Sequence, residues 1–76
     1  MPTAFVLVNT DVGMESDVQQ ELRSLEECLE AYIVYGAYDL VTKVNTETSS
    51  TLKEVITKKI RTIPAVRSTM TLLVVL

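Results

Sequence analysis

The 76-residue chain contains no histidine, no tryptophan and one cysteine, Cys28. One cysteine cannot form an intrachain disulfide, and without histidine or a second cysteine a zinc site of the usual Cys/His type is excluded. The lack of histidine also removes the commonest general base, and the sequence offers no Cys–His pair and no carboxylate pair in an apolar setting. We therefore expect no metal, no cofactor and no catalysis; turnover of a small substrate would overturn this expectation.

Basic residues are also few. Seven Lys and Arg stand against ten Asp and Glu, which gives a net charge of −3, and the basic residues are scattered along the chain. Binding to a phosphate backbone requires an excess of Lys and Arg, so no direct contact with nucleic acid is predicted. The N-terminus lacks the basic and apolar regions of a signal peptide, and the run from 72 to 76 is too short to span a bilayer. A lone thiol suits a reducing compartment, so we expect a cytoplasmic protein.

The short length predicts a single domain over residues 1–76. A domain of this size is only marginally stable alone and usually gains support from disulfides, a metal or a partner chain. Because the first two are excluded, composition alone predicts an oligomer.

Alternating and helical patterns divide the chain into six elements. The expected strands are Thr3–Asn9, Cys28–Tyr35, Tyr38–Asn45 and Ala65–Leu76, and the expected helices are Glu15–Glu27 and a segment from Thr51 to Pro64. Capping-box spacing is present at Ser16 with Gln19 and at Thr51 with Glu54. The link Gly36–Ala37 is short enough for a tight hairpin. The order β-α-β-β-α-β predicts an α+β, ferredoxin-like fold with two helices on one face of a four-stranded antiparallel sheet.

The sheet face without helices is expected to be apolar. The first strand places Ala4, Val6 and Val8 on one face but Phe5 and Leu7 on the other, and the last strand is also apolar on both faces. We expect Phe5 or Leu7 to lie beside Leu73 and Val75 on an open face. Monomers rarely expose such a patch, and burying several hundred Å² at about 25 cal/mol per Å² contributes several kcal/mol. A face-to-face sheet dimer is therefore predicted; the alternative is a mere surplus of β-branched residues in strands.

Four segments resemble the effector-binding domain of the Lrp/AsnC family of prokaryotic regulators. They are the opening strand and turn 3–13, the hairpin 32–41 (YIVYGAYDLV), the helix end 59–66 (KIRTIPAV) and the final strand 67–76. The chain departs from the family pattern at Tyr35, where Thr is frequent, and at Ala65, where Gly is usual. The resemblance implies a stand-alone form without the DNA-binding helix-turn-helix. It also implies a homodimer with facing sheets, a higher oligomer such as a tetramer of dimers, and a small ligand, usually an amino acid.

Carried over residue by residue, the resemblance implies a binding set in the hairpin and the last strand. The set is Val34, Tyr35, Gly36, Ala37, Tyr38, Asp39, Thr69 and Thr71. Asp39 would meet an ammonium group, and turn amides and threonine hydroxyls would meet a carboxylate. Simpler roles remain open: Gly36 for the turn, Asp39 as an acceptor for turn amides, the threonines and tyrosines as strand residues.

Two further interpretations remain open for the whole chain. An ACT-like amino-acid-binding domain has the same topology, but its sheets pair side by side rather than face to face. A structural adaptor would co-assemble with a full-length Lrp/AsnC-type regulator without a ligand of its own.

Overall fold

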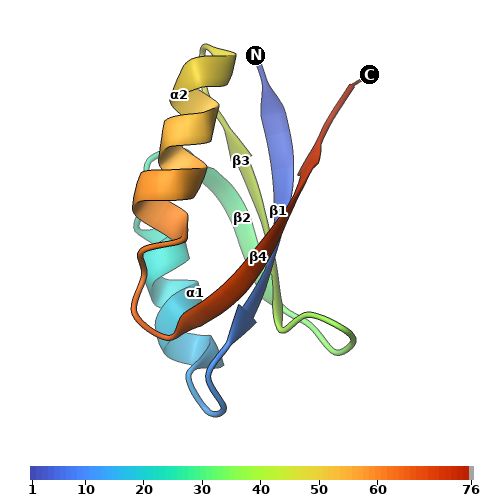
Figure 1. The fold of residues 1–76 in the computed structure, drawn as a ribbon, viewed down its shortest axis with the longest axis vertical. Helices are drawn as coiled ribbons and strands as arrows, with labels where there is room; N and C mark the ends of the chain where they lie inside the picture. Colours follow the sequence, from blue (N-terminus) through green and yellow to red (C-terminus); the bar gives the residue numbers. More distant parts are fainter. Residues whose placement is uncertain (76) are drawn as a thin grey trace.

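A computed structural model describes residues 1–75. The elements in chain order are β1 (Thr3–Thr10), α1 (Glu15–Arg23), β2 (Cys28–Ile33), β3 (Leu40–Asn45), α2 (Ser49–Glu54), the π-helical segment η1 (Val55–Ile60) and β4 (Val66–Leu73). The strands pair antiparallel in the order β2-β3-β1-β4, and both helices pack on the same face of the sheet (Figure 1). The predicted ferredoxin-like architecture is confirmed. None of the described helices is long and apolar enough to cross a membrane.

The core lies between the helices and every second residue of the central strands. Ala4, Val6 and Val8 of β1 pair with Val44, Thr42 and Leu40 of β3, and none of these six side chains has exposed surface. The helical layer contributes Val18, Leu22, Leu52, Val55, Ile56 and Ile60. The period of two in β1 and the helical spacing of residues 52, 55, 56 and 60 therefore place one side of each element in the core.

The first helix is shorter than predicted. It ends at Arg23 rather than Glu27, because residues 24–27 turn the chain into β2, with the amide of Cys28 donating to the carbonyl of Leu25. The side chain of Glu27, beyond the end of the helix, is 18% exposed and pairs with Lys59. The predicted cap at Ser16 is also wrong, since Met14 precedes the helix and supplies no side-chain cap.

The second helix begins earlier than predicted and changes its pitch. Thr48, not Thr51, is the N-cap, and its hydroxyl accepts a hydrogen bond from the amide of Thr51 at 3.1 Å. The last turns are π-helical, with the amide of Arg61 donating to the carbonyl of Ile56 five residues earlier. The helix ends at Ile60, four residues before Pro64.

The predicted two-residue hairpin at Gly36–Ala37 is wrong. Strand β2 ends at Ile33, which pairs with Leu40, so the connection runs through residues 34–39. Inside it the amide of Val34 donates to the carbonyl of Asp39 at 2.9 Å. The loop projects beyond the sheet at the end opposite the chain termini (Figure 1).

Strand β4 is shorter than the predicted range 65–76. It begins after Ala65, whose φ of 76° is the left-handed conformation that favours the glycine usual in the resembling family. It ends at Leu73, although the amide of Val74 still donates to the carbonyl of Thr3. Leu76 lies outside the described residues.

Candidate functional site

The face of the sheet opposite the helices is apolar, as predicted. Phe5, Leu7 and Val41 are half-buried, while Tyr32, Met70 and Leu72 are 51%, 47% and 49% exposed. The residues contributed by β4 differ from the expected ones, because Leu72 pairs with Phe5 and Met70 with Leu7. Leu73 pairs with Ala4 and therefore faces the helical side. We call the six exposed or half-buried residues of this side the open face.

Charged residues occupy one corner of the open face. Glu30 pairs with Lys43, and the hydroxyl of Tyr32 donates to the Glu30 carboxylate at 2.6 Å, which raises the pKa of Tyr32. The ammonium of Lys43 lies 5.8 Å from the centre of the Phe5 ring, within the range of a cation–π interaction. The open face thus has an apolar middle and a polar corner, the arrangement typical of protein interfaces.

Asp39 fixes the loop between β2 and β3 to the end of β1. Its amide donates to the carbonyl of Val8, and its Oδ2 accepts a hydrogen bond from the amide of Thr10, both at 2.9 Å. Its Oδ1 accepts no hydrogen bond from any residue in 1–75. Asp39 therefore has a structural role, in which it accepts a hydrogen bond from the amide of a strand residue and not from a turn amide. Its other carboxylate oxygen remains available to a ligand.

The tip of this loop has free hydrogen-bond donors. Within residues 1–75, the backbone amides from Tyr35 to Tyr38 have no acceptor. Gly36 has a φ of 149°, a conformation that L-residues rarely adopt, and a Cβ there would meet no atom within 4 Å. The side chain of Tyr35 is fully exposed. The loop therefore presents donors and an aromatic ring to whatever lies beside it.

A hollow of about 490 Å³ brings three of the predicted site residues together. We call it the loop hollow; it is lined by Glu15, Ser16, Ile33, Val34, Tyr35 and Asp39. Glu15 and Ser16 begin α1 and were not predicted, because only the tertiary packing of α1 beside β2 brings them here. Gly36 and Ala37 form the loop tip outside the hollow, and the Tyr38 hydroxyl reaches Met70 Sδ instead, at 3.8 Å.

Thr69 and Thr71 do not meet the loop within one chain. The loop reaches β4 through Tyr38, whose hydroxyl contacts Met70, but Thr69 and Thr71 do not line the loop hollow and each lines a different hollow. Thr69 pairs with Val8 and Thr71 with Val6, so both face the helical side. The predicted binding set is therefore divided between two regions of the molecule. No group of three potential metal ligands occurs among residues 1–75.

Residues 3–75 match the family model of the Lrp/AsnC ligand binding domain. The chain belongs to the Lrp/AsnC family. Over 71 residues it is 35% identical to the HTH-type transcriptional regulator FL11 of Pyrococcus abyssi, covering 93% of this chain and 46% of that regulator. The crystal structure of FFRP-DM1 superposes with a TM-score of 0.95 at 44% identity, over 99% of this chain and 100% of that one. The crystal structure of a hypothetical protein from Pyrococcus horikoshii superposes with a TM-score of 0.94 at 45% identity, over 100% of this chain and 92% of that one.

Membership of the Lrp/AsnC family decides several of the open questions. The matched family comprises ligand-binding domains of transcription regulators, not enzymes. It also favours the Lrp/AsnC effector-binding domain over the ACT-like domain as the interpretation of this chain. The chain spans about half the length of FL11, so the activity of that whole regulator does not transfer directly.

Proposed function

We propose that this Lrp/AsnC domain is a cytoplasmic amino-acid-sensing and oligomerisation module that modulates transcription through partner regulators. The observation that carries the proposal is the loop hollow. Asp39, which has one carboxylate oxygen without a partner, lines this hollow, and the backbone amides without acceptors lie in the same short loop, from Tyr35 in the lining to the adjoining tip.

These groups are complementary to a zwitterion. Asp39 Oδ1 would accept a charge-assisted hydrogen bond from the ammonium group of an amino acid. The amides of Gly36 and Ala37 would donate to its carboxylate, and the positive φ of Gly36 orients the tip of the loop. Val34 and Tyr35 would contact the side chain of the ligand. The volume of the hollow lies in the lower part of the roughly 300–1,000 Å³ range of small-molecule sites.

A second subunit is needed to complete the arrangement. The open face would pair with its copy, since it is the large apolar surface that the helices leave uncovered. Thr69 and Thr71 would then reach the ligand from a neighbouring subunit, because in their own chain they do not line the loop hollow. Ligand binding between subunits would couple amino-acid concentration to the assembly of dimers, for example into a tetramer of dimers.

A thermal-shift screen over the standard amino acids, combined with light scattering, tests the proposal. A ligand at about 100 times its Kd stabilises the native state by about 2.7 kcal/mol. The informative variant is Asp39→Asn, which keeps an oxygen for the Thr10 amide but removes the charge that would bind the ammonium. We expect it to lose the ligand-induced shift while its assembly is unchanged.

Asp11→Asn is the matched control, because Asp11 is exposed and lies outside the loop hollow. It should respond to the amino acid as the parent chain does. A full response of Asp39→Asn would remove Asp39 from the site. If no amino acid at several millimolar shifts the transition of the parent chain, the adaptor role without a ligand replaces the sensing role.

A further inference from the structure

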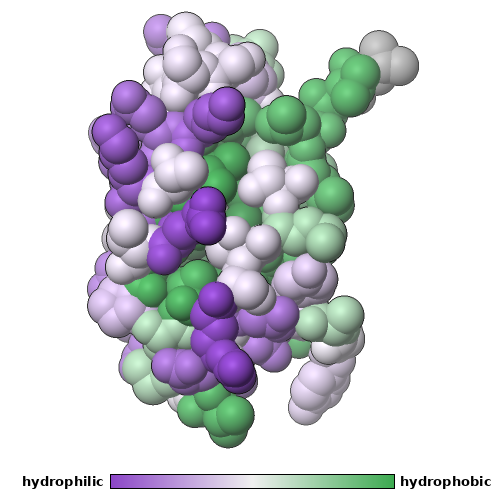
Figure 2. All heavy atoms as spheres, in the orientation of Figure 1, coloured by the Kyte–Doolittle hydropathy of each residue, from purple (hydrophilic) through white to green (hydrophobic). Residues whose placement is uncertain are grey.

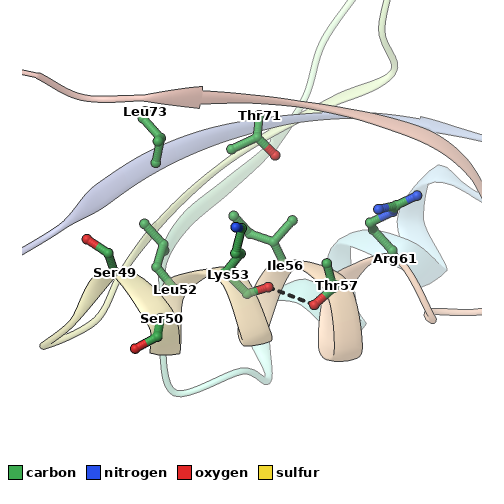
Figure 3. Close-up of a pocket in the computed structure, with 9 residues that line it drawn as sticks. All are labelled: Ser49, Ser50, Leu52, Lys53, Ile56, Thr57, Arg61, Thr71 and Leu73. Carbon is green, nitrogen blue, oxygen red and sulfur yellow. Dashed lines mark hydrogen bonds between the residues drawn. The ribbon is translucent and has the colours of Figure 1, made fainter.

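A second hollow lies on the helical side of the sheet, between β4 and the α2–η1 helix (Figure 3). We call it the β4 groove; its volume is about 610 Å³. Leu52 and Ile56 project from the helix toward the strand, and Thr71 and Leu73 project from the strand toward the helix. Two cationic side chains, Lys53 and Arg61, also line the groove.

The groove exists because the two helices do not cover the whole width of the sheet. Leu52 and Ile56 are buried at its base, at 2% and 8% exposure. Leu73 also faces the helical side, yet it is 64% exposed. The space above this edge strand is therefore apolar on both walls and open to solvent. It shares no lining residue with the loop hollow, and it lies on the opposite side of the sheet from the open face.

The charge of the groove differs from that of the whole chain. The net charge of the chain is −3, but the groove is lined by two cations and no carboxylate. Neither Lys53 nor Arg61 forms an ion pair with any residue in 1–75. In Figure 3 the apolar pair Leu52 and Leu73 lies toward one end of the groove and Arg61 at the other.

We propose that the β4 groove binds a free carboxylate with an apolar chain, separately from any amino acid at the loop hollow. The apolar chain would lie against Leu52, Ile56 and Leu73. The carboxylate would meet the planar guanidinium of Arg61, whose geometry suits a carboxylate group, and Lys53 would add attraction from the rim. The two cations favour an anion over a neutral ligand, and the apolar walls favour one that carries an apolar chain.

Calorimetric titration of the assembled protein with octanoate and with octan-1-ol tests the proposal, because the two probes share a chain length and differ in charge. Octanoate should bind at least about tenfold more tightly, which is the effect of about one charge-assisted hydrogen bond. Arg61→Gln should weaken octanoate binding about tenfold, Arg61→Lys less, and Lys53→Gln less again. Lys58→Gln removes the same charge from the same helix outside the groove and should leave binding unchanged.

Three results would overturn the proposal. One is equal binding of octanol and octanoate, and another is octanoate binding that Arg61→Gln does not weaken. The third is the absence of octanoate binding together with a smaller assembly in Leu73→Ser, which would show that a second copy of the chain occupies the groove. Loss of the amino-acid response in Asp39→Asn would have no bearing on the result, because Asp39 does not line the β4 groove.

Discussion

On the helical side of the sheet, Val6, Leu40 and Val44 have no exposed surface, whereas on the open face Tyr32, Met70 and Leu72 retain about half of theirs. The two sides are built from alternate residues of the same strands, and both are apolar. The helices of the chain cover only one of them. Figure 2 shows hydrophilic residues gathered over the helices and hydrophobic ones along the side of the sheet. Apolar alternation along a strand therefore predicts a buried face but not which molecule buries it.

The covered side of the sheet should determine whether the chain folds. Leu40 is fully buried, so Leu40→Ala removes apolar contacts and leaves a cavity, at a cost of about 2–5 kcal/mol in the free energy of unfolding. For a small domain this is a large part of the total. Urea denaturation followed by circular dichroism measures the loss. A cost below about 1 kcal/mol would mean that Leu40 does not belong to a tightly packed core.

The open face, by contrast, should determine assembly and not folding. Leu72 lies beside Phe5 on the open face, on the edge strand β4, so Leu72→Glu would place an unpaired charge in the proposed sheet-to-sheet interface. We expect a penalty of about 3 kcal/mol, or about a hundredfold rise in the dimer dissociation constant, with circular dichroism unchanged. Sedimentation equilibrium measures the dissociation constant.

Val12→Glu is the control for this experiment, since Val12 is 96% exposed and lies in the turn after β1. It adds the same charge without touching the open face. If Leu72→Glu and the parent chain show the same state of assembly, the open face is not the interface.

Sequence reasoning predicted the covered side better than the loop. In β1 the alternation of Ala4, Val6 and Val8 is a local pattern, and the structure confirms it. The length of the β2–β3 loop is set by a contact between Asp39 and Thr10, which are 29 residues apart. Local propensity cannot register such a contact, and it assigned Val34 and Tyr35 to a strand because β-branched and aromatic residues favour strands.

Some residues of the candidate site could likewise be predicted from the sequence, and others could not. The family resemblance pointed to Val34, Tyr35 and Asp39, and the structure brings these three together. Glu15 and Ser16 join them only through the packing of α1, so no motif indicated them. Thr69 and Thr71 line other hollows, and their places depend on the register of β4 against β1, which no local pattern reports.

A substitution at Ala65 should change the free energy of unfolding slightly and leave the assembly unchanged. Ala65, at the start of β4, has a φ of 76°, which costs an L-residue about 1–2 kcal/mol, and its methyl group packs partly against the core. Ala65→Gly should relieve this strain and raise the free energy of unfolding by about 0.5–1 kcal/mol net. The dimer dissociation constant should not change. A lower thermal midpoint in the variant would show that the methyl contact outweighs the backbone strain.

The smallest predicted effect lies in the contact between the helical layer and the turn before β2. The pKa of Glu27 is held below its ordinary value of 4.5, first by a backbone hydrogen bond and then by the Lys59 ammonium, which lies 3.1 Å from Oε2. A lowered carboxyl pKa stabilises the fold above the unfolded value, and this stabilisation is lost as the pH falls through the folded value.

Lys59→Met should therefore lower stability at pH 7, by less than about 1 kcal/mol because Lys59 is half-exposed. The difference between variant and parent, measured by urea denaturation, should shrink once the pH falls below about 4.5, because a protonated Glu27 has no charge to pair. A difference that stays constant from pH 7 to pH 3 would assign the effect to the apolar stem of Lys59, which covers the helical layer, and not to its charge.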